Sequence, residues 1–215
     1  MRVIPERTAV VIAGAWNQAI FTRDWVGDNI LTGLIEEAPE PEFQLASSTM
    51  KYGSAELPIT LTVSPHRVLV HPVTYTQEAV AAQEAATLRL LDHTYGAPLS
   101  GVGVNIGLDF MTDSPRYWNM FTLPDDSTFA KETSYKLTAD IRISRKIHLV
   151  DENALLTVSV FGVRGGSETS GIGHLDFNFH KDALSAQEIR TFASGKIGIY
   201  YSEAVRLADI VYGVK

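Results

Sequence analysis

The sequence contains no cysteine, and this absence excludes several kinds of site. Disulfides, thiolate nucleophiles, zinc fingers and iron–sulfur clusters all require cysteine sulfur. A chain without cysteine is also compatible with a reducing compartment, so we expect a soluble, cytoplasmic protein. No motif in the sequence defines a metal or cofactor site, and we expect neither a metal nor a cofactor.

The sequence also lacks a long hydrophobic run and an excess of positive charge. The longest apolar run near the N-terminus, residues 9–16, is too short to span a bilayer, and no small-residue cleavage site follows it. We therefore expect no membrane association. The net charge of −7 disfavours nucleic acid as a partner, because that binding depends on clustered Lys and Arg that neutralise phosphates. A local basic patch would still permit it.

The remaining composition is that of a globular protein. Hydrophobic residues make up 45% and charged residues 20% of the 215 residues, which is typical of a chain with a buried core. No internal repeat and no shift in composition marks a boundary. We therefore expect a single α+β domain over residues 1–215.

The order of the local patterns predicts a mostly antiparallel sheet. The clearest helix follows Thr76 as N-cap and stops before Gly96, and we expect it to be the one long central helix. Ser185 and Glu188 form a capping box that opens a C-terminal helical region, in which residues after Gly195 fit either a strand or a helix. Helices separated by runs of adjacent strands favour an antiparallel α+β sheet. The predicted strands are residues 9–16, 43–50, 59–63, 67–70, 101–110, 137–150, 154–163 and 173–179.

The strand predicted over residues 101–110 has one apolar and one nearly bare face. Glycine, asparagine and aspartate alternate with apolar side chains, and a bare face lets another element pack closely. The spacing of Gly101, Gly103 and Gly107 misses the dinucleotide-binding fingerprint by one residue, and Pro115 follows where a phosphate-binding helix would begin. These features exclude a Rossmann-type nucleotide site.

The best candidate for chemistry is a polar strand face at His174, Asp176, Asn178 and His180. Neighbouring positions on one face lie about 7 Å apart. His174 and Asp176 could therefore share a hydrogen bond, or ligate a metal with help from another strand. On this basis His174, Asp176 and His180 are candidate catalytic residues of a hydrolase or nuclease-like enzyme. The alternative is a half-buried strand whose outer face is solvated.

Three aromatic residues are candidate binding residues. Tyr117, Trp118 and Phe121 lie in residues 111–132, where two prolines and the absence of a period predict a long loop. Such loops often carry function, so the aromatic side chains could bind a partner. Alternatively, they close the edge of the core.

Arg142 and Lys146 are the other candidate binding residues. Both lie on the basic face of the strand predicted over residues 137–150. This face could bind nucleic acid. If it lies near the His174 strand in the sheet, its charges would instead pair across the strands and serve the fold.

Residues 68–110 resemble the central part of a sporadically distributed bacterial family of unknown function. In that family a strand ends at a position like Tyr75-Thr76, a helix follows to a Tyr-Gly or Tyr-Pro stop, and a strand rich in glycine and asparagine comes next. The stretch from Leu175 through the Ser185 helix is similar to the family's last strand and helix. The final helix departs from the family because it lacks the expected histidine.

The resemblance implies a bacterial or phage protein encoded beside unrelated partners, with an accessory or defence-related role and no established catalytic residues. The missing motifs, the bare face of the strand over residues 101–110 and the aromatic loop 117–121 favour a non-catalytic binding or assembly protein that acts through a protein partner or self-association. An enzyme that uses the His174 strand and a nucleic-acid-binding protein that uses Arg142 and Lys146 are the alternatives.

Overall fold

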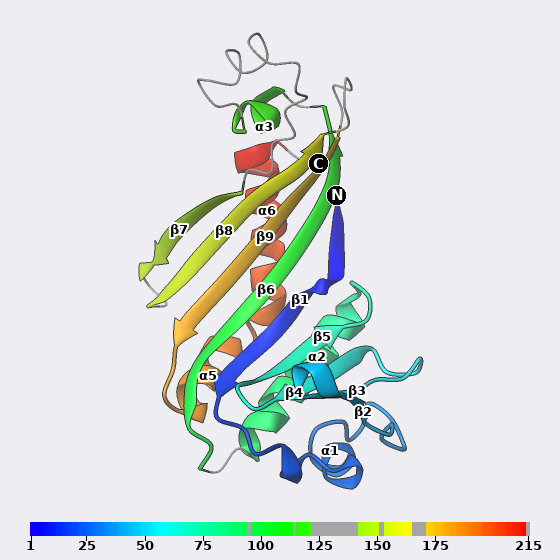
Figure 1. The fold of residues 1–215 in the computed structure, drawn as a ribbon. Coiled ribbons are helices and arrows are strands. Elements are labelled where there is room, and N and C mark those ends of the chain that lie inside the picture. The colour runs from blue at the N-terminus through cyan, green and yellow to red at the C-terminus, as the bar shows by residue number, and fades with distance from the viewer. Residues whose placement is uncertain (94–95, 114, 122–141, 151–152, 165–170, 214–215) are drawn as a thin grey trace.

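A computed structural model describes residues 1–93, 96–113, 115–121, 142–150, 153–164 and 171–213 (Figure 1). The elements follow one another along the chain in this order: β1 (Arg2–Gly14), η1 (Gln18–Ile20), α1 (Arg23–Asn29), β2 (Glu42–Gln44), η2 (Leu45–Ser47), β3 (Thr49–Tyr52), β4 (Ile59–Ser64), β5 (Arg67–Pro72), α2 (Gln77–Asp92), β6 (Leu99–Thr112), α3 (Pro115–Asn119), β7 (Ile143–Leu149), β8 (Ala154–Arg164), β9 (Gly171–Asp182), α5 (Ala186–Ala193) and α6 (Ile197–Tyr212).

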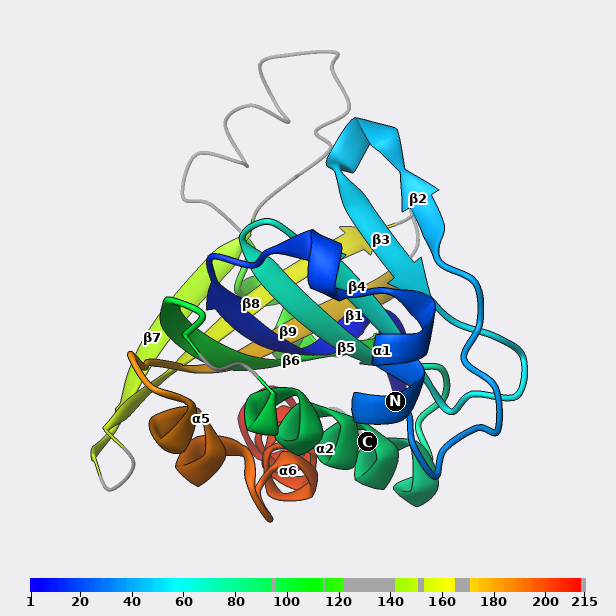
Figure 2. The ribbon, with the colours of Figure 1, turned by 90° about the horizontal axis from the view of Figure 1, so that it is seen from below.

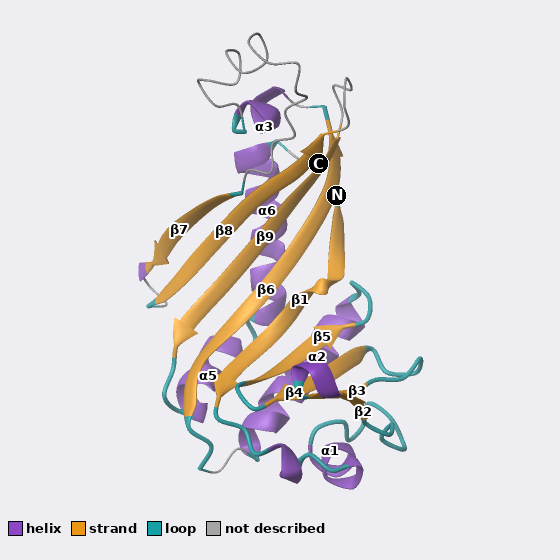
Figure 3. Cartoon of the chain, in the orientation of Figure 1, coloured by secondary structure: helices purple, strands orange, loops and turns teal. Residues whose placement is uncertain are grey.

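All nine described strands join one antiparallel sheet in the order β2-β3-β4-β5-β1-β6-β9-β8-β7 (Figure 3). The predicted α+β class with an antiparallel sheet is therefore confirmed. The structure does not single out one central helix, because α2 and α6 are each 16 residues long. The two described edges of the sheet are β2 and β7.

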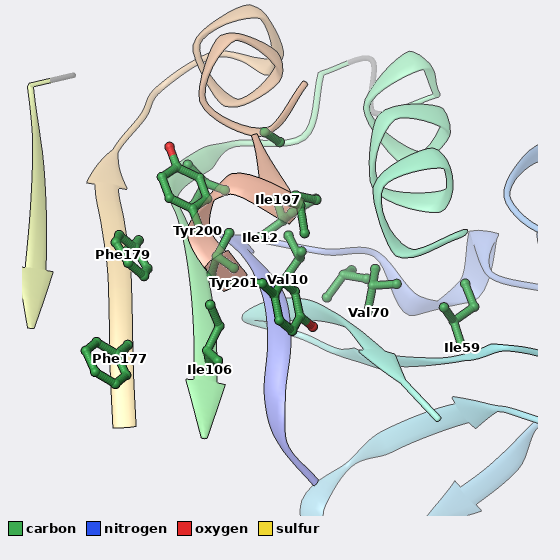
Figure 4. Close-up of a cluster of buried hydrophobic side chains, with 14 of the residues drawn as sticks. Val10, Ile12, Ile59, Val70, Ile106, Phe177, Phe179, Ile197, Tyr200 and Tyr201 are labelled. Carbon is green, nitrogen blue, oxygen red and sulfur yellow. The ribbon is translucent and has the colours of Figure 1, made fainter. Parts of the chain in front are cut away.

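The helices α2, α5 and α6 lie together on one side of the sheet (Figure 2). Strand residues that face them are apolar and buried, including Ile106, Phe177 and Phe179 (Figure 4). The Phe179 ring stacks on Tyr200 of α6 with 4.8 Å between the ring centroids. The core therefore lies between the helices and one face of the sheet, and the polar strand positions lie on the opposite face. We call this opposite face the open face.

Local signals placed several elements correctly. Thr76 caps α2 by accepting a hydrogen bond from the Ala79 backbone N–H at 3.1 Å. Ser185 accepts one from the Glu188 N–H at 3.2 Å, which confirms the capping box. The ambiguous segment after Gly195 is helical, since α6 begins at residue 197. Each cap satisfies a backbone donor that the first helical turn leaves unpaired.

Other boundaries differ from the prediction. Residues 43–50 are not one strand but a hairpin, β2–η2–β3, which turns through Ser48 in the left-handed conformation (φ 50°). The first strand starts at Arg2 rather than at residue 9. In the predicted loop 111–132, residues 111–112 still belong to β6 and residues 115–119 form the short helix α3. Residues 122–132 lie outside the described residues, as do residues 137–141 of the predicted basic strand.

Candidate binding sites

The predicted polar face of β9 lies on the open face of the sheet. Leu175 and its apolar neighbours point into the core, whereas His174, Asp176, Asn178 and His180 are half-buried on the other side. The bare face of β6 is continuous with it, because Asp109 stands directly opposite His174 and Gly107 opposite Asp176. The polar positions of two strands therefore form one surface.

A bulge in β1 adds a cation to this surface. The register between β1 and β6 shifts between Ile4 and Ala9, so that Arg7 leaves the regular strand. At the bulge, the Thr8 hydroxyl takes the place of backbone hydrogen bonds between the strands. It donates to the Ile4 carbonyl at 2.8 Å and accepts from the Gly107 N–H at 3.2 Å. A Cβ atom on Gly107 would lie 2.5 Å from the Arg7 Cβ, so only glycine lets Arg7 lie over β6.

These contacts create a cluster of charged and aromatic side chains, which we call the polar cluster. It consists of Arg7, Asp109, Arg142, Phe161, His174 and Asp176. The Arg7 guanidinium lies 2.7 Å from Asp109 and 3.4 Å from Asp176, and Arg142 lies 3.6 Å from the second oxygen of Asp176. Both carboxylates therefore have an arginine partner. Burial raises the pKa of Asp176, and the Arg7 and Arg142 charges oppose that rise.

His174 is held by the carboxylate opposite it and by an aromatic ring. Its Nδ1 lies 2.6 Å from Asp109 Oδ1. The same Nδ1 lies 3.2 Å from Arg7 Nη1, so the Asp109 carboxylate and the Arg7 guanidinium meet at one ring nitrogen. The imidazole stacks on Phe161 with 4.8 Å between centroids, and the Arg7 and Arg142 guanidiniums lie 5.5 and 5.4 Å from the same ring. The ring orientation is thus fixed from several sides.

The polar cluster is better suited to joining strands than to catalysis. A general base must be able to reach a substrate proton, yet every carboxylate here is engaged by an arginine and the imidazole is flanked by Phe161. His174 is bonded to Asp109 rather than to Asp176. His180 lies apart, with its Nδ1 3.4 Å from the Asn178 carbonyl. Within the described ranges, no group of three or more His, Asp and Glu side chains is arranged to hold a metal.

Among the described residues of the open face, four buried polar atoms lack a hydrogen-bond partner: Arg7 Nε, Asp176 Oδ1, Asn105 Oδ1 and Asn178 Oδ1. They form two neighbouring pairs. Arg7 Nε is 3.4 Å from Asp176 Oδ1, and Asn105 stands opposite Asn178 on the next strand. A donor and an acceptor are present in each pair, so small side-chain rotations satisfy them without a ligand.

The three aromatic candidates are buried. Tyr117, Trp118 and Phe121 belong to the core cluster at the far end of the sheet. The Tyr117 hydroxyl donates to the Phe161 carbonyl at 2.6 Å and accepts from the His174 N–H at 3.2 Å, which bridges β8 and β9. The second interpretation, in which these residues close the edge of the core, fits this burial, and a binding role for them stays a prediction.

The two basic candidates differ in their surroundings. Arg142 reaches across β8 and pairs with Asp176. This is the cross-strand charge pair that the sequence analysis gave as the structural alternative to nucleic-acid binding. Lys146 lies on β7, opposite Thr157 of β8, and is exposed at the edge of the sheet. The structure therefore brings Arg142 into the polar cluster and leaves Lys146 outside it.

A second site lies at the opposite edge of the sheet. The hairpin β2–η2–β3 and the segment from η1 to the start of α1 enclose a groove of about 480 Å³, which we call the β2 groove. Its lining residues, all uncharged, are Gln18, Ala19, Phe21, Thr22, Pro41, Phe43, Gln44, Leu45, Ser48, Thr49 and Met50. Phe43 is 64% and Leu45 is 92% exposed, although both are large and apolar.

The chain segment that forms the β2 groove is rich in acidic residues. Residues 17–52 contain six acidic and two basic residues. Arg23 pairs with Glu37 and with Glu40, at 2.9 Å for the second pair. Glu42 is exposed on β2 opposite Lys51. The groove therefore has an uncharged lining within a segment of net negative charge.

Sequence patterns alone missed Arg7 and the β2 groove. Arg7 follows Pro5 and Glu6, a stretch without alternation, and only the bulge in β1 brings it to the polar cluster. Phe43 and Leu45 fit the pattern of a half-buried strand, because apolar residues at alternate positions predict that one face of the strand is covered. The signal that could have revealed the groove is the acidic, proline-containing segment 36–42 directly before them, which favours an exposed chain at the sheet edge.

None of the helices within the described ranges combines the length and the hydropathy that a transmembrane span requires. Comparison of the chain with family models, with curated proteins and with solved structures finds no match. The resemblance of residues 68–110 to a bacterial family therefore stays a prediction.

Proposed function

We propose that the protein is a non-catalytic binding or assembly protein that acts through a protein partner at the β2 groove. The observation that carries the proposal is the pair of exposed apolar side chains, Phe43 and Leu45, beside a groove with an uncharged lining. Full burial of a large apolar side chain in an interface contributes about 1.5–3 kcal/mol to the free energy of binding. Contiguous apolar surface of this kind, bordered by polar residues, is typical of interaction sites.

The polar cluster supports a structural rather than a catalytic role. Its charges balance, with two arginines facing two aspartates. It also connects β1, β6, β8 and β9 across the open face. We further infer that the protein works in the cytoplasm as an accessory component of a bacterial or phage multi-protein system, an inference that rests on the absence of cysteine and on the resemblance of residues 68–110.

Site-specific photocrosslinking tests the proposal. A photoreactive phenylalanine analogue replaces Phe43 in one protein and Leu184 in a control, because Leu184 is also apolar and 81% exposed. We expect a defined crosslinked species in cells of the protein's own host only for position 43. Reconstitution with the purified partner should then fail for Phe43→Ser. Equal crosslinking at both positions, or none at position 43, would contradict the proposal.

A second candidate function is hydrolysis with His174 as general base. The 2.6 Å contact between Asp109 and His174 favours it, because such a contact orients the imidazole. This function requires turnover of an activated ester or phosphodiester, for example a nitrophenyl substrate, that His174→Gln abolishes. Turnover at the rate of the uncatalysed reaction would rule it out for that substrate class.

A further inference from the structure

Among the residues that the structure describes, no strand pairs with the outer side of β2. β2 is the terminal strand of the sheet, and all three of its residues are exposed. An edge strand presents unpaired N–H and C=O groups, and natural edges are otherwise covered, strongly charged or twisted away. Phe43, Gln44 and Pro41 also line the β2 groove. An extended chain that pairs with β2 would therefore lie along the groove.

The register of the hairpin determines which side chains such a chain would need. Phe43 stands opposite Met50, which is buried, so Phe43 faces the same side of the sheet as the core. Glu42 and Gln44 stand opposite Lys51 and Thr49 and face the other side. Because directly opposed residues share a face, an added strand would place one set of side chains against Phe43 and the alternate set against Glu42.

The chemistry of the two sides is different. On one side, Phe43 and Met50 give the groove apolar lining, and its volume of about 480 Å³ can enclose side chains of a ligand. On the other side, Gln44 and Thr49 add uncharged polar lining. The side with Glu42 lies in a region that contains six acidic and two basic residues. Arg23, one of these two basic residues, is already occupied by Glu37 and Glu40. Lys51, the other basic residue, stands opposite Glu42, so residues 17–52 keep a net charge of −4, which favours a cation.

We infer that the occupant of the β2 groove is an extended, basic segment of a partner protein, with apolar and Lys or Arg side chains at alternate positions, which adds a strand to β2. This inference rests on the proposed function and specifies the partner's recognition segment. Backbone pairing supplies part of the affinity, and the pockets for alternate side chains supply the specificity.

Labelled peptides test the inference directly by fluorescence anisotropy. One seven-residue peptide alternates valine and lysine, a second alternates valine and glutamate, and a third is the lysine peptide with a central proline that removes a backbone donor. We expect saturable binding of the lysine peptide alone, with an affinity that falls as salt rises. Phe43→Ser and Leu45→Ser should each weaken binding at least about tenfold, whereas Leu184→Ser should not. All three side chains are exposed, so the variants should remain folded.

Equal affinity for the lysine and glutamate peptides, or an affinity that Phe43→Ser leaves unchanged, would overturn the inference. Concentration-dependent dimers in sedimentation velocity that Phe43→Ser dissolves would also overturn it, because the occupant would then be a second copy. If crosslinking at position 43 finds a partner while no peptide binds, the basic segment is wrong and the binding function stands. If both fail, the groove is not a binding site.

Discussion

The polar cluster makes a quantitative prediction for Arg7→Met, which removes the guanidinium and keeps an apolar stem. Arg7 contacts Asp109 at 2.7 Å, Asp176 at 3.4 Å and the Leu108 carbonyl at 3.0 Å. Exposed ion pairs contribute about 0.2–1 kcal/mol, whereas breaking a buried pair costs about 3–5 kcal/mol. The Arg7 side chain is 27% exposed, so solvent screens it in part. We expect the free energy of unfolding to fall by about 2 kcal/mol at pH 7.

The loss should depend on pH because Arg7 opposes the raised pKa of Asp176. Without Arg7 the folded-state pKa of Asp176 rises further above the unfolded value of about 3.9. The folded state then holds a proton that the unfolded state releases, and stability falls as pH rises from the unfolded to the folded pKa. The deficit of Arg7→Met should therefore be larger at pH 7 than at pH 4.

Urea unfolding followed by circular dichroism, at both pH values, measures these differences. Arg206→Met is the matched control, because Arg206 pairs with Glu203 on the surface of α6 and should leave the free energy of unfolding nearly unchanged. A deficit no larger than that of Arg206→Met would refute the assignment of Arg7 as the cation that joins the strands. A deficit that is equal at pH 4 and pH 7 would refute the coupling to Asp176.

Three further substitutions test the fold around the two sites. Tyr117→Phe removes the hydroxyl that bridges β8 and β9 and should lower the free energy of unfolding by about 1–3 kcal/mol, so an unchanged urea midpoint would refute the bridge. Gly107→Ala places a Cβ against Arg7 and should cost about 1–3 kcal/mol in the same assay; an increase in stability would show that Arg7 lies elsewhere. Thr76→Ala should cost about 1 kcal/mol through the lost cap of α2, and a loss below experimental error would contradict it.

Local chemistry made part of the fold predictable from the sequence. Caps at Thr76 and Ser185 act within four residues, and the hairpin between β4 and β5 closes over Pro65 and His66. Alternation along β9 separated core from polar positions because a strand has only two faces. Each of these signals depends on neighbours in sequence, which a pattern can show.

The candidate sites depended on contacts that no local pattern contains. Asp109 and His174 are 65 residues apart and meet only because β6 and β9 pair in one particular register. Arg7 joins them through an irregular bulge, for which sequence provides no period. Phe43 looked like a core residue, but a core position requires an opposing layer, and β2 lies at the sheet edge. Tertiary placement therefore decided which residues are exposed.

Native mass spectrometry of the protein purified gently from its own host, with Phe43→Ser measured in parallel, shows whether a partner protein binds at the β2 groove. We expect a defined complex with a second, different chain for the unaltered protein and the free chain for the variant. A lone chain that carries a small ligand or a metal, or a complex that Phe43→Ser leaves intact, would contradict it.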